Sequence, residues 1–361
     1  MSVKFAASQL YPVLKKINEM WGDPRTARDL EQPIETARAI MENQLITLDP
    51  VLVGKSCRAF EVTWLKRCGI DAIDCADEEY DDTSADDCTI TGEELESAKA
   101  EYDAAGCLTD SFMVWDDDCK GLHSFEEKVA RGLIECMKNI RKAVNLAAVS
   151  FLSANVQTNN YTGGLGVVDG DLTYFDPSLW NVDLIGEFQL NANLNKIRQP
   201  VFVSGTNLWN VFFNAMYNKS NDDQRDQGFK MDHFKRWYFD AETVDPTLGQ
   251  PSTLMFDRGS VGFFSKNEFE NNAPFNNNDK NNTFTYSMPD PSMTFMDDGT
   301  PKQARYDVIT QVVCKTTKNG IPKFGRVFKL IFRYAYILSP EDCAGDTGLL
   351  HFVKGTAPVE G

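Results

Sequence analysis

The sequence is poor in histidine, in basic charge and in long apolar runs, and each shortage disfavours a class of function. Three of its 361 residues are histidine, and they stand alone at His123, His233 and His351. The longest stretch without a charge is interrupted by asparagine and glycine, which a bilayer core would reject, and the amino terminus has no signal-peptide-like apolar run. We therefore expect a protein that is neither exported by such a signal nor inserted into a membrane.

Basic charge is scarce overall and acidic charge is concentrated in one segment. The chain has 36 basic and 53 acidic residues, a net charge of −17. Between Asp71 and Asp118 stand 18 acidic residues and a single basic one, Lys99, so this window alone carries the whole excess. Such a balance disfavours a protein that grips nucleic acid by neutralising phosphates. The 42% of hydrophobic residues still predicts a folded core.

The nine cysteines do not form a metal-binding pattern. Seven of them lie between Cys57 and Cys136, and no two are spaced as in a zinc module. The acidic runs also lack the alternation and the glycine of a calcium loop. We predict no metal site; free thiols and disulfides that form later both stay open. Cys136 and Cys314 lie in periodic apolar contexts, which predicts buried, unreactive thiols.

Motifs for catalysis are fragmentary. Gly54-Lys55-Ser56 resembles the end of a phosphate-binding loop, but Asp49 stands where the first glycine is needed. Asp232-His233 has no partner nucleophile, and acid pairs such as Asp222-Asp223 and Asp297-Asp298 arise by chance in an acidic protein. We predict no catalytic residue, no cofactor and no enzymatic activity.

The first half of the chain predicts one dominant helix. Ser124 and Glu127 form a capping box, and apolar residues recur with helical spacing from Phe125 to about Asn155. Before it, Ile34–Leu45 has helical spacing. Arg58–Lys66 and Ser111–Trp115 alternate as strands on either side of the acidic stretch, which suggests a two-stranded projection with no core of its own.

The second half predicts shorter elements and a late pair of long strands. Residues 218–304 are rich in loops, with one short strand. The expected elements are helices at Pro177–Asn195 and Asn207–Tyr217 and strands at Val201–Ser204, Gly259–Ser265, Tyr306–Thr316, Val327–Leu338 and Leu349–Val353. The two long strands flank Asn319-Gly320, a strong hairpin signal.

This order of elements resembles the major capsid proteins of tailed bacteriophages, whose fold is named after phage Hong-Kong-97. The resemblance implies an α+β fold, and its segments would fall in chain order. They are an N-terminal arm (1–56), an extended E-loop (57–119), a P-domain with a long spine helix (120–200), an A-domain (201–305) and returning strands of the A- and P-domains (306–361). The cysteine-rich, acidic loop resembles capsid proteins of phages that infect Bacteroidetes.

The resemblance also implies a function. The chain would assemble as hexamers and pentamers into the icosahedral shell of a virion around double-stranded DNA, in the cytoplasm of a host bacterium. Its partners would be scaffolding, portal and decoration proteins. Inter-subunit contacts are expected on the two projection strands, at Phe60, Val62, Trp64, Phe112, Val114 and Trp115. Cys57 and Cys119, at the base of the projection, are a predicted disulfide of released virions.

Two alternatives remain open from the sequence. An encapsulin-like nanocompartment shell shares the same fold and encloses enzymes instead of DNA. A glycan-acting enzyme or glycan-binding protein is suggested by the aromatic content of 11%, the asparagine-rich loops and the paired acids.

Overall fold

The computed structural model covers the chain in separate described stretches. These are residues 12–13, 15–17, 19–20, 34–45, 47–48, 59–65, 97–103, 106–115, 124–161, 164–180, 184–206, 208–209, 211, 236–243, 252–267, 283–297, 299–316, 322–338 and 347–357. For 47–48, 59–65, 97–103, 283–284 and 291 only the backbone is described.

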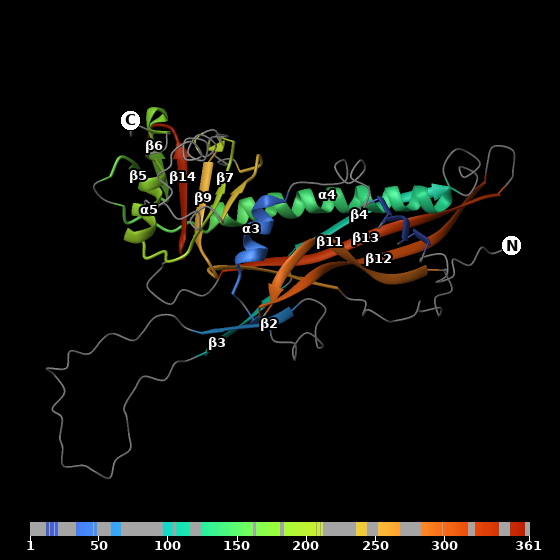
Figure 1. Cartoon of the computed structure of the whole chain (residues 1–361). Coiled ribbons are helices and arrows are strands. Elements are labelled where there is room, and N and C mark those ends of the chain that lie inside the picture. The colour runs from blue at the N-terminus through green and yellow to red at the C-terminus, as the bar shows by residue number, and fades with distance from the viewer. Residues whose placement is uncertain are drawn as a thin grey trace, which may run out of the picture.

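A long helix on a sheet of long strands forms the largest part of the body. The helix is α4 (Phe125–Ala154), and in Figure 1 it runs along the strands. The five-stranded antiparallel sheet has the order β10-β13-β12-β11, and β4 also pairs with β13. Its strands are β4 (Gly106–Trp115), β10 (Val261–Lys266), β11 (Thr283–Asp297), β12 (Thr300–Thr316) and β13 (Pro322–Leu338).

The amino-acid sequence explains where α4 begins and how it sits on the sheet. The Ser124 hydroxyl accepts a hydrogen bond from the Glu127 backbone N–H at 3.2 Å, which caps the first turn. Buried residues then recur every three or four positions along the helix. Phe112 of β4 stacks on Phe328 of β13, with ring centroids 5.1 Å apart. Gly132 gives α4 the space to approach Phe112 closely.

The second part is a six-stranded sheet with the order β5-β6-β14-β9-β7-β8. Its strands are β5 (Val167–Asp169), β6 (Leu172–Phe175), β7 (Pro200–Ser204), β8 (Trp237–Phe239), β9 (Ser252–Asp257) and β14 (Leu349–Lys354). The short 3₁₀ helix η2 (Pro177–Leu179) and the helix α5 (Leu184–Leu194) follow β6.

The central strands of the six-stranded sheet, β6, β7, β9 and β14, are buried on both faces. In β7, Val201 and Val203 join the core that contains α4, whereas Phe202 joins the aromatic core under α5. The same alternation places Phe256 of β9 in the first core and Phe352 of β14 in the second. Continuous apolar runs are the pattern expected of strands covered on both sides.

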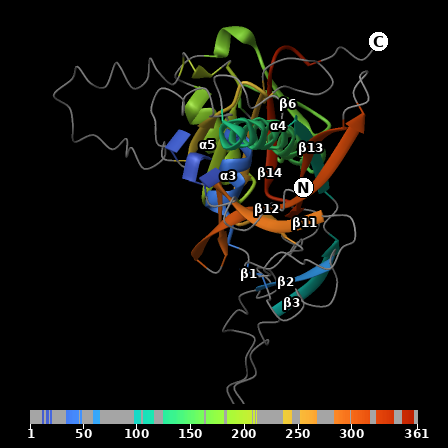
Figure 2. The ribbon, with the colours of Figure 1, turned by 90° about the vertical axis from the view of Figure 1, so that its right-hand side faces the viewer.

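A small three-stranded sheet, β1-β2-β3, is separate from the other two. It comprises β1 (Thr47–Leu48), β2 (Ala59–Leu65) and β3 (Ser97–Asp103), all antiparallel. Seen along the axis of α4, the order is α4, then the five-stranded sheet, then β1–β3 (Figure 2). The three-stranded sheet therefore lies on the side of the five-stranded sheet that α4 does not cover.

The predicted α+β class is confirmed, and so are most of its elements. The long helix ends within one residue of its predicted end, and Ile34–Leu45 contains α3 (Glu35–Asn43). The strands predicted at Arg58–Lys66, Val201–Ser204, Tyr306–Thr316, Val327–Leu338 and Leu349–Val353 are β2, β7, β12, β13 and β14, and Gly259–Ser265 overlaps β10. In the described residues no helix combines the length and apolarity needed to span a bilayer.

The predicted pairing of the projection is wrong. Ser111–Trp115 lies in β4, which pairs with β13 in the five-stranded sheet, with Trp115 opposite Gly325. The partner of β2 is β3, with Phe60 opposite Tyr102. Because β3 reads SAKAEYD, it has no large aliphatic residue to mark it as a strand.

Other predictions need smaller corrections. Pro177–Asn195 is not one helix, because η2 and α5 are separate elements. Strands β8, β9 and β11 lie in the region predicted to be loop-rich. Most of Asn207–Tyr217 and the pair Asn319-Gly320 fall outside the described residues.

The predicted segment boundary at residue 200 divides a packed unit. The strands β5 and β6 and the helix α5 precede it, yet they pack with β7, β9 and β14 around one aromatic core. As assignments to named domains, the boundaries stay predictions.

Alanine substitutions at two helical glycines, Gly132 and Gly186, should change the stability of the fold in opposite directions. A Cβ at Gly132 would lie 2.3 Å from the Phe112 ring, whereas a Cβ at Gly186 in α5 would meet nothing within 4 Å. We expect Gly132→Ala to destabilise the fold by about 1–3 kcal/mol through overpacking. Gly186→Ala should stabilise it by up to about 1 kcal/mol through helix propensity. Urea denaturation measures both, and equal effects of the two changes would contradict this packing.

Candidate functional site

The described residues hold no group of side chains suited to binding a metal ion. No group of three or more His, Cys, Asp or Glu side chains converges among them. His351 is buried within β14, and Asp297 forms an ion pair with Lys302. The other candidates from the sequence, including Gly54-Lys55-Ser56, Asp222-Asp223 and Asp232-His233, lie outside the described residues.

A buried ion pair joins α4 to β11. Arg141 is fully buried, and its Nε and Nη2 donate to the two carboxylate oxygens of Asp290 at 2.9 and 2.5 Å. The Tyr306 hydroxyl and the Ser292 backbone N–H also donate to this carboxylate. Burial alone lowers the pKa of Arg141, but Asp290 and Tyr306 outweigh it and hold the pKa above its usual value. The arrangement fixes the position of α4 on the sheet.

A second buried carboxylate, Asp240, joins three elements. It follows β8 and accepts hydrogen bonds from the Thr36 backbone N–H at 3.1 Å and the Thr36 hydroxyl at 2.5 Å, in the first turn of α3. Asn145 of α4 donates to it at 2.6 Å and accepts from the Ala37 N–H at 3.1 Å. No side chain of the helix itself caps α3, so Asp240 fulfils that role from a distant strand.

Three asparagines join the segment that follows α4 to β6 and α5. Asn159 donates to Thr173 of β6 and to Asn191 of α5, both at 2.7 Å. Asn195 donates to Asn159 at 2.6 Å and to the Asn191 carbonyl at 2.9 Å. A buried amide network of this kind specifies one packing arrangement, because each member left unpaired would be strongly unfavourable.

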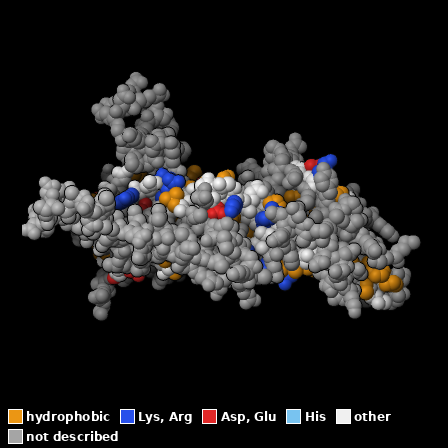
Figure 3. All heavy atoms as spheres, turned by 90° about the horizontal axis from the view of Figure 1, so that it is seen from below, with side chains coloured by type: hydrophobic (Ala, Val, Ile, Leu, Met, Phe, Trp, Pro, Cys, Tyr) orange, Lys and Arg blue, Asp and Glu red, His pale blue; other side chains and the backbone are white. Residues whose placement is uncertain are grey.

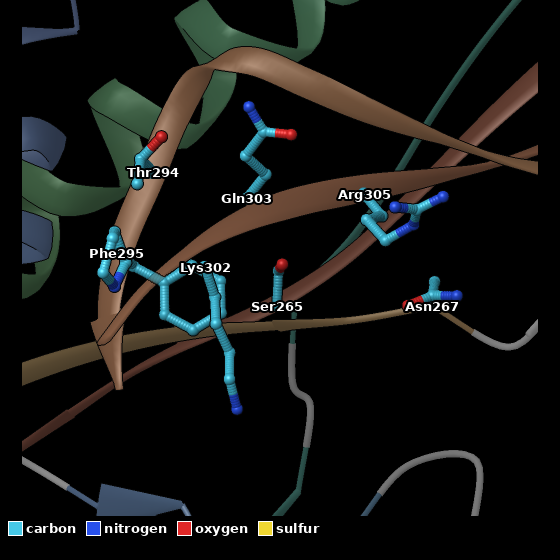
Figure 4. A pocket seen from close by; sticks show the side chains of 8 residues that line it. Ser265, Asn267, Thr294, Phe295, Lys302, Gln303 and Arg305 are labelled. Carbon is cyan, nitrogen blue, oxygen red and sulfur yellow. The ribbon is translucent and has the colours of Figure 1, made fainter. Parts of the chain in front are cut away.

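A hollow of about 600 Å³ opens at one edge of the five-stranded sheet. It is bordered by the end of β10, by Thr294 and Phe295 of β11, and by the first residues of β12 (Figure 4). Lys302 and Arg305 lie on its rim, but Lys302 pairs with Asp297 and Arg305 donates to the Ser287 hydroxyl at 2.8 Å. With both cations already engaged, the hollow is no evident ligand site.

Large apolar side chains are exposed on the six-stranded unit. Leu165, just before β5, and Val167, its first residue, are more than half exposed, and the exposed Leu190 and Leu194 lie one turn apart on α5. Next to them Tyr161 donates to Glu187, and burial together with this carboxylate raises the pKa of Tyr161 to about 12. Exposed aliphatic side chains on neighbouring elements are a feature of surfaces that bind other proteins.

The face of the five-stranded sheet that points away from α4 is basic. Even-numbered residues of β4 face α4, since Asp110 accepts from Asn139 at 2.8 Å and Phe112 packs on Gly132. Register then places six cations on the opposite face, which we call the basic face: Lys266, Arg305, Lys315, Lys323, Lys329 and Arg333. Among the described strand residues of that face, Asp307 is the acidic one, and it pairs with Arg333. Seen from below, Lys and Arg side chains lie along the body (Figure 3).

The predicted contact residues have different positions. Phe112 and Val114 lie on the α4 side of β4, and Val114 is 7% exposed, so it has little surface to offer a neighbour. Trp115 lies on the basic face. The side chains of Phe60, Val62 and Trp64, and the whole of Cys57 and Cys119, are outside the described residues, so these predictions stay untested.

The prediction that Cys136 and Cys314 are buried is confirmed for Cys136 and wrong for Cys314. Cys136 is buried in the core, where burial, with Asp110 nearby, raises its pKa to about 12. Cys314 is exposed, which corrects the expectation of a buried thiol. Cys314 is one of the last three residues of β12, all of which are exposed.

The sequence alone did not indicate the roles of the two buried carboxylates, Asp240 and Asp290. Asp290 stands in Pro289-Asp290-Pro291, a sequence that reads as a turn, and Asp240 follows a short strand in a region without periodicity. The available signal was Arg141, a charged residue placed among the apolar positions of the long helix. A buried cation demands a partner, although the sequence does not say which.

Comparisons with known proteins give similarities in structure only. No protein-family description and no curated protein matches the sequence. A structure from Mycobacterium phage Adephagia aligns with TM-score 0.44 and 11% identity over 94% of this chain and 95% of its own. The capsid structure of cyanophage P-SCSP1u gives 0.40 and 7% over 84% and 85%, and the holo-SrpI encapsulin complex of Synechococcus elongatus gives 0.28 and 11% over 73% and 81%. Because every TM-score is below 0.5, none of these similarities decides the fold or the function.

The buried ion pair can be tested by removing one charge at a time. Asp290→Asn leaves Arg141 charged in the core, and we expect a loss of about 3–5 kcal/mol in the free energy of unfolding. Arg131→Met, on the exposed side of the same helix, breaks the 3.2 Å ion pair with Glu127 and should lose less than about 1 kcal/mol. Urea denaturation of both variants decides, and a loss below 1 kcal/mol for Asp290→Asn would rule out a structural role for the pair.

Thiol reactivity tests the burial of Cys136. At pH 8 we expect iodoacetamide to label the exposed Cys107 and Cys314 at least about 100-fold faster than Cys136, because the reactive thiolate of Cys136 is suppressed. Peptide mass spectrometry at timed intervals measures each site, and unfolding in urea should equalise the rates. Rapid labelling of Cys136 in the folded protein would be inconsistent with this core.

Proposed function

We propose that the chain is a shell-forming protein of the tailed-phage major-capsid type. Its copies would assemble as hexamers and pentamers into an icosahedral shell around double-stranded DNA, with scaffolding, portal and decoration proteins as partners. The shell would form in the cytoplasm of a host bacterium and become the capsid of the virion. In this role the chain needs no catalytic residue.

The single observation that carries the proposal is the separate sheet β1–β3. Two strands of seven residues, β2 and β3, pair only within this small sheet, while the other described helices and strands pack around shared cores. A three-stranded sheet of this size is marginal without a surface to pack on. A neighbouring copy would provide that surface, and repeated docking would make assembly cooperative.

The rest of the layout supports the same proposal. In the terms of that fold, residues 1–56 would be the N-terminal arm and β2–β3 with their connection the E-loop. The spine helix α4 and the five-stranded sheet would form the P-domain. The six-stranded sheet with α5 would form the A-domain, and its exposed Leu165, Val167, Leu190 and Leu194 would face other subunits.

Shell formation can be tested with the purified protein. We expect closed particles in negative-stain electron microscopy and a fast boundary in sedimentation velocity as the concentration is raised. Replacing residues 66–96 by a short Gly-Ser linker should leave the body folded, with unchanged circular dichroism, but abolish particles. As a control, the same replacement of the asparagine-rich residues 268–282 should leave particle formation largely intact.

Two outcomes would contradict the proposal. One is a wild-type protein that stays monomeric with or without co-expressed scaffold. The other is closed particles from the variant that lacks 66–96. The contents of particles isolated from producing cells separate a phage capsid, which encloses DNA, from an encapsulin-like shell, which encloses an enzyme.

A further inference from the structure

One end of the basic face combines cations with an exposed aromatic and aliphatic surface. Trp115, the last residue of β4, has Lys315 Nζ at 4.3 Å and Lys323 Nζ at 5.7 Å from its ring centroid. Met113, two residues before Trp115 on the same face, is 47% exposed. It pairs with Val327 of β13, and the exposed Lys329 lies two residues after Val327 on that strand. Three lysines thus surround an apolar centre, a surface suited to a partner with both carboxylates and apolar side chains.

The same chain contains a segment whose acidic and apolar side chains complement the surface around Trp115. The connection from β2 to β3 begins with Lys66 and Arg67, and its remaining residues, 68–96, contain 12 acidic residues and no Lys or Arg. They also contain Ile70, Ile73 and Tyr80 between the acids. Outside Asp71–Asp118 the acidic and basic residues balance, so this connection is the strongest source of negative charge in the molecule.

The strand directions favour docking between two copies over docking within one. The strand β3 ends at Asp103 and β4 begins at Gly106, opposite Tyr334. Trp115 lies at the other end of β4, nine residues after Gly106, which corresponds to roughly 30 Å. In Figure 1, β2 and β3 lie below the body, displaced from β4 toward the side of the six-stranded sheet.

We propose that the Trp115 end of the basic face is an electrostatic receptor for the acidic residues 68–96 of a second copy of this chain. The proposal rests on the shell function above and adds what selects the docking position. Lys315, Lys323 and Lys329 attract the acidic segment, and Trp115 with Met113 contacts its apolar side chains. Attraction between opposite charges sets the register of docking and is weakened by salt.

Cross-linking between labelled copies tests the contact itself. Equal amounts of ¹⁴N and ¹⁵N protein are mixed at low salt, allowed to associate and treated with a zero-length carbodiimide, which joins carboxylates to lysines in direct contact. We expect mixed-isotope links from Asp or Glu of 68–96 to Lys315, Lys323 or Lys329. Links confined to one isotope would show docking within a single copy and overturn the proposal.

Charge reversal tests the energetics. The variant Lys315→Glu, Lys323→Glu, Lys329→Glu should need about tenfold more protein for half-maximal association in 0.15 M NaCl. The matched control reverses Arg131, Lys138 and Lys142 on α4, which carries the same change in charge and should shift this concentration less than about threefold. Reversing Asp77, Glu78 and Glu79 to Lys should restore association of the receptor variant.

The outcomes separate this inference from the shell function. Closed particles that form equally well in the receptor variant and in 1 M NaCl would overturn the electrostatic receptor and leave the shell function standing. Mixed-isotope links in a small oligomer that never closes would support the receptor and overturn the shell function. A strictly monomeric protein would overturn both.

Discussion

The contact between Arg141 and Asp290 is the interaction on which the rest of the structure depends. A buried guanidinium without a carboxylate is so unfavourable that α4 has one acceptable position along the sheet. Asp290 continues the alternation of β11, in which the even-numbered Tyr286 and Met288 are also buried, and so it faces α4. It stands where the register of β11 becomes irregular, between Pro289 and Thr294.

The next turn of α4 extends this constraint to the second sheet. Asn145 lies four residues after Arg141, on the same side of the helix, and donates to Asp240 at the end of β8. Asp240 in turn caps α3, whose last residue precedes Gln44. The Gln44 side chain donates to the Met296 carbonyl of β11 and accepts from the Phe263 N–H of β10. Polar contacts from two adjacent helical turns thus join both sheets into a single body.

The sequence predicted what depends on local pattern and missed what depends on distant partners. The capping box at Ser124, the apolar period of α4 and the alternation of β12 and β13 are each readable within a few residues, and the structure confirms them. The pairing of β2 with β3 could not be predicted in this way. Ser97–Asp103 has small and charged residues, and it forms a strand by pairing with β2. Asp240 and Asp290 are likewise single polar residues whose roles appear only once chain segments about 100 to 200 residues apart are brought together.

The division between a constrained body and a weakly supported projection is itself an argument for assembly. Burial on both faces of the central strands of the six-stranded sheet and the polar contacts of α4 give the body a core of its own. The small sheet β1–β3 pairs with neither of the other sheets, and much of the chain's acidic excess lies in the connection between β2 and β3, whereas six cations lie on the basic face. Stability for a monomer would favour opposite charges that meet within one copy. Under the proposed docking, one copy's acidic segment meets another copy's cations, and this attraction favours copies that lie side by side.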